Sequence, residues 1–157
     1  MSTSEILVGV ISDTHGLLRR EALAALRGSD LVIHAGDVGK PEIIDELRRI
    51  APVHAVRGNV DMAAWAAALP LTQRVEAGAC VFHVLHDISS LDIDPPAAGL
   101  AAVVFGHSHK PSMQTRAGIL YLNPGSAGPR RFALPVSVAR VRVVGARIEP
   151  EIVTLDV

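Results

Sequence analysis

The chain has 157 residues, of which 49% are hydrophobic, 20% charged and 3% aromatic, and its formal net charge is -1. This length predicts a single domain spanning residues 1–157, with an aliphatic core between helices and a buried sheet. The near-neutral charge excludes a general attraction to nucleic acid or to an anionic membrane surface. We therefore expect no extended nucleic-acid binding.

Two features bear on the compartment. Cys80 is the only cysteine, so an internal disulfide is excluded and a reducing compartment is compatible. The apolar run at residues 6–11 is too short for a secretory signal, and no apolar stretch approaches the roughly 18 to 20 residues that span a bilayer. We therefore expect a cytoplasmic protein that does not associate with membranes.

The first half of the chain alternates between apolar runs of strand length and segments with helical spacing. Strands are expected at residues 6–11, 31–33 and 53–56, and helices at residues 17–27, 41–50 and 62–69. Pro41 suits the first turn of the second helix, and Asp61 is placed to cap the third. Such an order implies parallel strands joined by right-handed crossovers, with ligand-binding loops at the carboxyl ends of the strands.

The second half changes to strands joined by short turns. They are expected around Val75 and at residues 80–85, 103–105, 119–122, 136–143 and 148–155. Residues 92–99 and 123–129 contain proline and glycine and are expected to form loops. This half predicts a second sheet packed on the first, within one layered α/β domain.

Side chains that bind metals follow several of the expected strands. They are Asp13, His15, Asp37, Asn59, His86, His107 and His109. Carboxylate, amide and imidazole ligands without a thiol suit Mn, Fe, Zn, Ni or Co. Two such ions, typically ~3.5 to 4 Å apart, lower the pKa of a shared water and hold both oxygens of an in-line displacement, for which phosphorus is the natural centre. The pattern predicts a binuclear hydrolase of phosphate esters.

Single members of this set have structural alternatives. Asp13 alone is also typical of a turn or cap, and Gly58-Asn59 is an ordinary turn dipeptide. His107 and His109 are the strongest signal, because two imidazoles two residues apart after a buried strand are seldom needed for packing.

The remaining histidines and several arginines have competing interpretations. His34, His54 and His83 lie inside apolar runs, where we expect hydrogen-bonded core or supporting roles, although His83 competes with His86 as a ligand. Either Arg57 or the pair of residues 130–131 could meet an anionic substrate, and the alternative for the pair is a solvated basic rim.

Five motifs, in this order, resemble those of the calcineurin-like metallophosphoesterase family, and within it the small single-domain phosphodiesterase branch. They are Ser12-Asp13-Thr14-His15-Gly16, His34-Ala35-Gly36-Asp37, Arg57-Gly58-Asn59-Val60-Asp61, Gly106-His107-Ser108-His109 and Asn123-Pro124-Gly125-Ser126. The resemblance runs from residue 6 to about residue 126. It implies an α/β fold, a four-layer αββα sandwich of two mixed β-sheets flanked by helices.

The resemblance also implies a phosphodiesterase with a binuclear metal centre and a metal-bridging hydroxide as nucleophile. One ion would be held by Asp13, His15, Asp37 and His109, and the other by Asp37, Asn59, His86 and His107. Asp37, which bridges, is then expected to be catalytic together with Asn59 and His107. The expected cofactors are two divalent ions, manganese first and nickel, iron, zinc or cobalt otherwise. The expected partner is a small phosphate ester, and a homo-oligomer stays open.

Two positions depart from the family pattern. Val60 stands where larger members carry a histidine that assists the leaving group, which favours diesters or substrates with good leaving groups. Asp87 stands where the family has glycine, and it could support a ligand, alter one metal site or simply form a turn. The alternatives for function are a protein-binding scaffold, as in a retromer subunit of this fold, and a phosphomonoesterase or nuclease using the same site.

Overall fold

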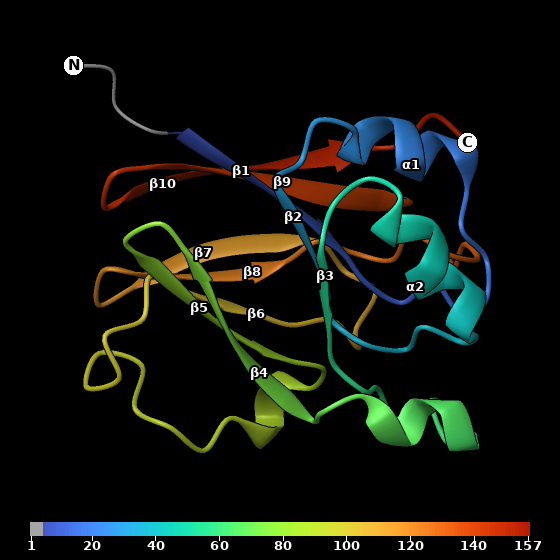
Figure 1. The fold of residues 1–157 in the computed structure, drawn as a ribbon, viewed down its shortest axis with the longest axis horizontal. Helices are drawn as coiled ribbons and strands as arrows, with labels where there is room; N and C mark the ends of the chain where they lie inside the picture. Colours follow the sequence, from blue (N-terminus) through green and yellow to red (C-terminus); the bar gives the residue numbers. More distant parts are fainter. Residues whose placement is uncertain (1–4) are drawn as a thin grey trace.

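The computed structural model describes residues 5–157, in which two five-stranded sheets lie face to face (Figure 1). The first sheet has the order β10-β9-β1-β2-β3, and the second β4-β5-β6-β8-β7. The first comprises β1 (Glu5–Ile11), β2 (Leu31–His34), β3 (Val53–Ala55), β9 (Ser137–Val144) and β10 (Arg147–Thr154). The second comprises β4 (Thr72–Ala77), β5 (Cys80–Leu85), β6 (Ala102–Val104), β7 (Ser112–Arg116) and β8 (Ile119–Asn123).

Each sheet contains three adjacent parallel strands, extended on its edges by antiparallel ones. In the first sheet β1, β2 and β3 are parallel, β9 pairs antiparallel with β1, and β10 pairs antiparallel with β9. In the second sheet β5, β6 and β8 are parallel, and β4 and β7 are antiparallel edges. The expected two mixed sheets are therefore confirmed. The carboxyl ends of parallel strands share one edge of a sheet, and this edge carries the candidate site.

The main core lies between the sheets, where Val8 and Val10 of β1 pack with Phe82 and Val84 of β5. Side chains of a strand alternate between its two faces, so Ile11 belongs to a second cluster beneath the helices. The helices α1 (Arg20–Leu26) and α2 (Pro41–Arg48) cover this outer face of the first sheet (Figure 1). The strands thus hold their ends rigidly between two apolar layers.

The outer face of the second sheet has a thinner cover. Leu85 and Val103 pack there with Ile88 and Leu91, from a loop that contains the 3-10 turn η2 (Ile88–Ser90). Within residues 5–157 this fourth layer contains no α-helix. No helix in the same range has the length and apolar character needed to cross a membrane.

Three local expectations are corrected. The helix expected at residues 62–69 is the 3-10 turn η1 (Ala64–Ala68). The Asp61 side chain does not cap it and instead accepts hydrogen bonds from backbone amides outside this segment. The first helix begins at Arg20, three residues later than expected. The strand β7 was not expected, because most of its residues are polar and four of its five are exposed.

Candidate metal centre

Every candidate ligand lies just beyond the carboxyl end of a parallel strand. Asp13 and His15 follow β1, Asp37 follows β2 and Asn59 follows β3. From the second sheet, His86 follows β5, and His107 and His109 follow β6. The two sheets therefore contribute four and three of these side chains to one place. Their roles as ligands stay predictions, while their proximity is a property of the structure.

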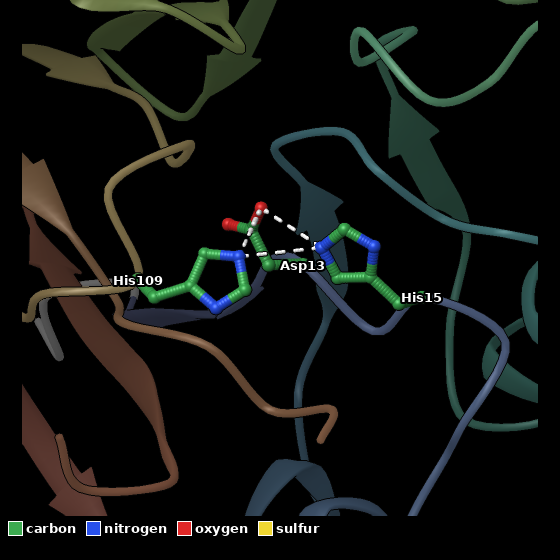
Figure 2. A group of neighbouring side chains, drawn as sticks. All are labelled: Asp13, His15 and His109. Atoms are coloured by element: carbon green, nitrogen blue, oxygen red, sulfur yellow. Dashed lines mark hydrogen bonds and ion pairs between the residues drawn. The ribbon is translucent and has the colours of Figure 1, made fainter. Parts of the chain in front are cut away.

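Asp13, His15 and His109 form the first group of side chains, and Figure 2 shows both imidazoles turned toward the carboxylate. The Oδ1 atom of Asp13 lies 3.6 Å from Nε2 of His15 and 3.4 Å from Nε2 of His109. The two Nε2 atoms are 3.3 Å apart. Three potential ligand atoms thus face a common point, although 94 residues separate His15 from His109.

Asp13, Asp37 and His86 form a second group next to the first. The Oδ2 atom of Asp37 lies 3.1 Å from Nε2 of His86 and 3.6 Å from Nε2 of His15. This single oxygen therefore faces one imidazole from each group. Asp13 also belongs to both groups, since its Oδ1 lies 3.9 Å from Nε2 of His86.

Asn59 and His107 lie at the exposed side of the second group. The Oδ1 atom of Asn59 is 3.3 Å from Nδ1 of His107, and the His107 and His86 rings meet edge to face at 5.2 Å. Both Asn59 and His107 are exposed, whereas Asp13, Asp37, His86 and His109 are buried. A ligand arriving from solvent would meet these two side chains first.

Hydrogen bonds fix the orientation of the buried members. The Ser12 hydroxyl donates to Oδ2 of Asp13 at 2.7 Å, and the backbone N–H of His107 donates to the same oxygen at 3.1 Å. The Nδ1–H of His86 donates to the carbonyl of Ala35 at 2.8 Å. This bond directs Nε2 of His86 toward Asp37, and an Nδ1–H held by a backbone carbonyl is the arrangement that metal-binding histidines use.

The site contains buried polar atoms without partners. Within residues 5–157, Oδ1 of Asp13 and Nε2 of His86 are buried and accept or donate no hydrogen bond. Such atoms are rare, because burial without a partner costs about 1–3 kcal/mol. Both belong to the second group and face a space bordered by carboxylate and imidazole. This donor set fits divalent cations of the borderline class.

The charges of the cluster support one another. Burial acts to raise the pKa of Asp13, but contacts with His109, His15 and Ser12 outweigh it and hold this pKa well below its ordinary value. Burial likewise opposes the lowered pKa of Asp37, which results from His86 and the Val60 N–H. Both carboxylates are therefore ionised at neutral pH, as cation ligands must be.

The backbone around the cluster adopts an unusual conformation. Positive φ angles occur at five of the candidate ligands, namely Asp13, His15, Asp37, His107 and His109. Only Ala117 and Phe132 share this among the other non-glycine residues in the range 5–157. Left-handed backbone costs about 1–3 kcal/mol per residue and concentrates at functional sites. The tightly wound loops turn each side chain toward the common centre.

A second layer of contacts connects the loops. The hydroxyl of Thr14 contacts Nε2 of His34 at 3.0 Å and donates to the carbonyl of Val38 at 2.8 Å. The backbone N–H of Gly36 donates to Nδ1 of His34 at 3.1 Å. This completely buried histidine thus has the supporting role that its apolar surroundings predicted.

Asp61 is a supporting residue whose role sequence reasoning missed. Its buried carboxylate accepts hydrogen bonds from the backbone N–H groups of Val38, Gly39 and Gly58. The available signal was its position two residues after Asn59, which places a carboxylate between neighbouring strand ends. It is not the local helix cap that its position in the sequence predicts.

The structure also gives distinct positions to the other two histidines and to Asp87. His83 lies on the outer face of β5, beside Val103, while His86 joins the cluster. His54 contacts Gln73 at 3.1 Å. The Asp87 carboxylate accepts hydrogen bonds from the backbone and hydroxyl of Ser89, which is a turn role.

The three arginines considered for substrate binding differ in their distance from the cluster. The guanidinium of Arg130 donates to the carbonyls of Leu134 and Val157, and Arg131 is exposed. Arg57 lies at the edge of a cavity that also contains His86 and His107. Of the three arginines considered for substrate binding, Arg57 is thus the one placed beside the cluster.

Sequence comparison connects this geometry to a known family. A model of the calcineurin-like phosphoesterase superfamily domain matches residues 6–145. The chain belongs to the calcineurin-like phosphoesterase family. A probable metallophosphoesterase of Methanothermobacter thermautotrophicus is 31% identical over 160 residues, covering 94% of this chain and 92% of that protein. The expected family resemblance is confirmed.

Solved structures share the fold. Vacuolar protein sorting 29 from Cryptosporidium parvum aligns with a TM-score of 0.83 at 22% identity, over 96% of this chain and 92% of that one. An archaeal phosphodiesterase aligns with a TM-score of 0.79 at 20% identity, over 94% of this chain and all of that one. At these sequence identities, the two comparisons show only that the chain shares the fold of these proteins.

Proposed function

We propose that the chain is a phosphodiesterase that depends on two divalent cations, manganese being the first choice. The observation that carries this proposal is the convergence of seven potential ligands around buried atoms that form no hydrogen bond. Membership of a phosphoesterase family supports the reaction class. The fold shared with an archaeal phosphodiesterase is consistent with diester substrates.

Asp13, His15, Asp37 and His109 would hold one cation, and Asp37, Asn59, His86 and His107 the other. The position of Asp37 supports a bridging role, because its Oδ2 faces both His15 at 3.6 Å and His86 at 3.1 Å. Two bound cations would supply Lewis acidity toward the phosphoryl oxygens and a nucleophile at neutral pH. Asp13 would contribute through its free Oδ1, since its other oxygen is already bonded to Ser12.

Asn59 and His107 would orient the substrate at the exposed side of the site. The Asn59 amide has an oxygen for a cation and an N–H₂ group that can donate to a phosphate oxygen. Neighbouring Val60 has an apolar side chain and therefore cannot donate a proton to the leaving group. This favours diesters whose leaving group departs readily without protonation.

The test measures hydrolysis of bis(p-nitrophenyl) phosphate by protein loaded with Mn, Ni, Fe or Zn. Asp37→Asn should lose at least about 100-fold in kcat/KM and should bind less metal, because one bridging charge is removed. Asp45→Asn is the control, since Asp45 forms only an exposed ion pair with Arg48 on α2. Failure of the wild type to hydrolyse the diester with any of these metals would contradict the proposal.

Substrate panels distinguish diesterase from monoesterase activity. The proposal expects a larger kcat/KM for bis(p-nitrophenyl) phosphate than for p-nitrophenyl phosphate under the same metal. Both esters release the same alcohol, so the comparison isolates the effect of the second substituent. A clear preference for the monoester would replace the proposed diesterase by a phosphomonoesterase that uses the same residues.

A further inference from the structure

A cavity of about 410 Å³ opens directly beside the metal-ligand cluster. Its lining includes His86, His107 and Asn59 of the cluster, together with Leu71 and residues of the segment 85–92. Ligand sites in proteins commonly have volumes of about 300 to 1,000 Å³ and combine apolar walls with a few polar groups. A substituent on a phosphate held by the cluster would therefore have this space within reach.

The cavity walls combine apolar surface with groups that have no partner. Leu71 is 61% exposed although it is a large hydrophobic residue, and Leu85 lines the same space. Within residues 5–157, the side chains of Arg57 and Asp92 form no hydrogen bond or ion pair with other protein groups. An exposed leucine and an unpaired guanidinium suit an aromatic ring, which apolar contact and cation–π attraction both favour.

The charges of the cavity select against anionic substituents. Arg57 contributes one positive charge, whereas Asp87 and Asp92 contribute two negative ones. A substituent carrying further phosphates would meet a net negative wall, so an uncharged ring is the better occupant.

A second hollow lies on the other side of the Arg57–Asn59 segment. It is lined by Asp61, Met62 and alanines of the 63–67 segment, and no histidine lines it. The cavity at Leu71 contains two candidate metal ligands from the second sheet, whereas this hollow contains only Asn59. A group attached to the bound phosphorus is accordingly expected on the Leu71 side.

We propose that the cavity between Leu71 and Asp87 binds one organic substituent of the substrate, an uncharged group the size of an aromatic ring. This inference rests on the proposed function for the position of the phosphate, and it deepens it by defining a substrate class. The preferred substrates are then phosphodiesters with at least one ring-sized, uncharged arm. Leu71 and Arg57 determine this specificity and take no part in the displacement at phosphorus.

The test compares two inert probes, phenylphosphonate and methylphosphonate, by calorimetric titration of the manganese-loaded protein. We expect the wild type to bind the phenyl compound about tenfold more tightly, because its ring is transferred from water to the cavity. Leu71→Ser should reduce this ratio to about twofold, and Arg57→Gln should weaken the phenyl compound further than the methyl compound. Since Leu71 is exposed, its replacement leaves the buried core unchanged.

Met62→Ser is the matched control, because Met62 is 87% exposed and lines the other hollow. Equal affinity of the wild type for the two probes, or no binding of either, would overturn the inference. A ratio that survives Leu71→Ser or is lost in Met62→Ser would overturn it as well. Binding is measured without turnover, so a protein that binds with the expected ratio but hydrolyses no diester contradicts the proposed function alone.

Discussion

The carboxylate of Asp61 accepts a hydrogen bond at 3.1 Å from the backbone N–H of Val38, which lies 23 residues earlier in the chain. The same oxygen accepts a bond from Gly58 at 2.9 Å, and the other oxygen accepts one from Gly39 at 3.0 Å. Asp61 thereby joins the loop that carries Asp37 to the loop that carries Asn59. Together with the bond from the Val60 N–H to Asp37, this buried carboxylate fixes the separation of the two candidate ligands.

We predict that Asp61→Ala lowers the free energy of unfolding by about 2–4 kcal/mol, because three backbone N–H groups, those of Val38 and Gly58 being buried, lose a charged acceptor. Metal affinity should fall as well, since the Asp37 and Asn59 loops separate. Urea unfolding and calorimetric metal titration measure the two effects. Asp30→Ala is the control, because Asp30 accepts a backbone bond from Leu7 at an exposed position away from the site. Equal losses of metal affinity in both variants would refute the joining role.

Gly58 lies against Asp37, and a Cβ atom at this position would overlap the backbone nitrogen and carboxylate of Asp37. Gly58→Ala should therefore displace the candidate bridging carboxylate, with a stability cost of about 1–3 kcal/mol and a clear drop in metal affinity. Gly99→Ala serves for comparison, since Gly99 has φ +70 and open space around it. It should cost about 1 kcal/mol from backbone strain and leave metal affinity unchanged. Unchanged metal affinity in Gly58→Ala would contradict the close approach.

His34 predicts a pH dependence of stability. Burial lowers its pKa from 6.5 to about 4, because the charged ring is poorly solvated inside the protein. The unfolded chain takes up a proton near pH 6.5 while the folded chain does not. The free energy of unfolding should thus fall as the pH falls from about 6.5 to about 4, by at most about 3 kcal/mol.

Urea unfolding of the metal-free protein between pH 7.5 and pH 4 measures this effect. His34→Gln should be less stable at pH 7.5 and should show a shallower decline toward low pH, because the other titrating groups remain. The difference between the two curves isolates the histidine. Parallel curves for the wild type and the variant would show that His34 does not cause the decline.

Val60 is 47% exposed, and its backbone N–H donates to Oδ1 of Asp37 at 3.0 Å. A larger side chain fits at this position, and the backbone bond does not depend on its identity. Val60→His should raise kcat/KM for a dialkyl diester, whose alkoxide leaving group needs a proton, relative to a bis-aryl diester, by about 10-fold or more if the imidazole protonates the departing oxygen. The rates for both substrates are compared in the wild type, in Val60→His and in Val60→Leu. An equal change for the two substrates would show that the histidine gives no protonation.

The parts of the fold that could be predicted from the sequence are those set by local pattern. The strands before Asp13, Asp37 and His86 are continuous apolar runs, and their burial between layers explains why the pattern was clear. Parallel strands bring their carboxyl ends together, so the convergence of the candidate ligands followed from the order of motifs. The family match agrees with this interpretation.

The remaining features depend on contacts between distant residues. Asp61 has the spacing of a helix cap, but its carboxylate binds two backbone amides of another loop and that of Gly58 in its own loop, and the segment after it forms a 3-10 turn. The strand β7 has no apolar face, and pairing with β8 alone defines it. Neither partner can be read from the neighbouring sequence, because sheet pairing and long-range hydrogen bonds override local propensity.

The contribution of candidate ligands by both sheets has a mechanical consequence. Between the sheets the contact is apolar and therefore carries no directional constraint, so small sliding of one layer over the other is resisted mainly by packing. Cations held jointly by Asp37 of one sheet and His86 of the other would cross-link the two sheets at one edge. Loading the protein with metal should then restrict motion of the two sheets relative to each other. Amide hydrogen exchange should slow even in strands far from the metal site.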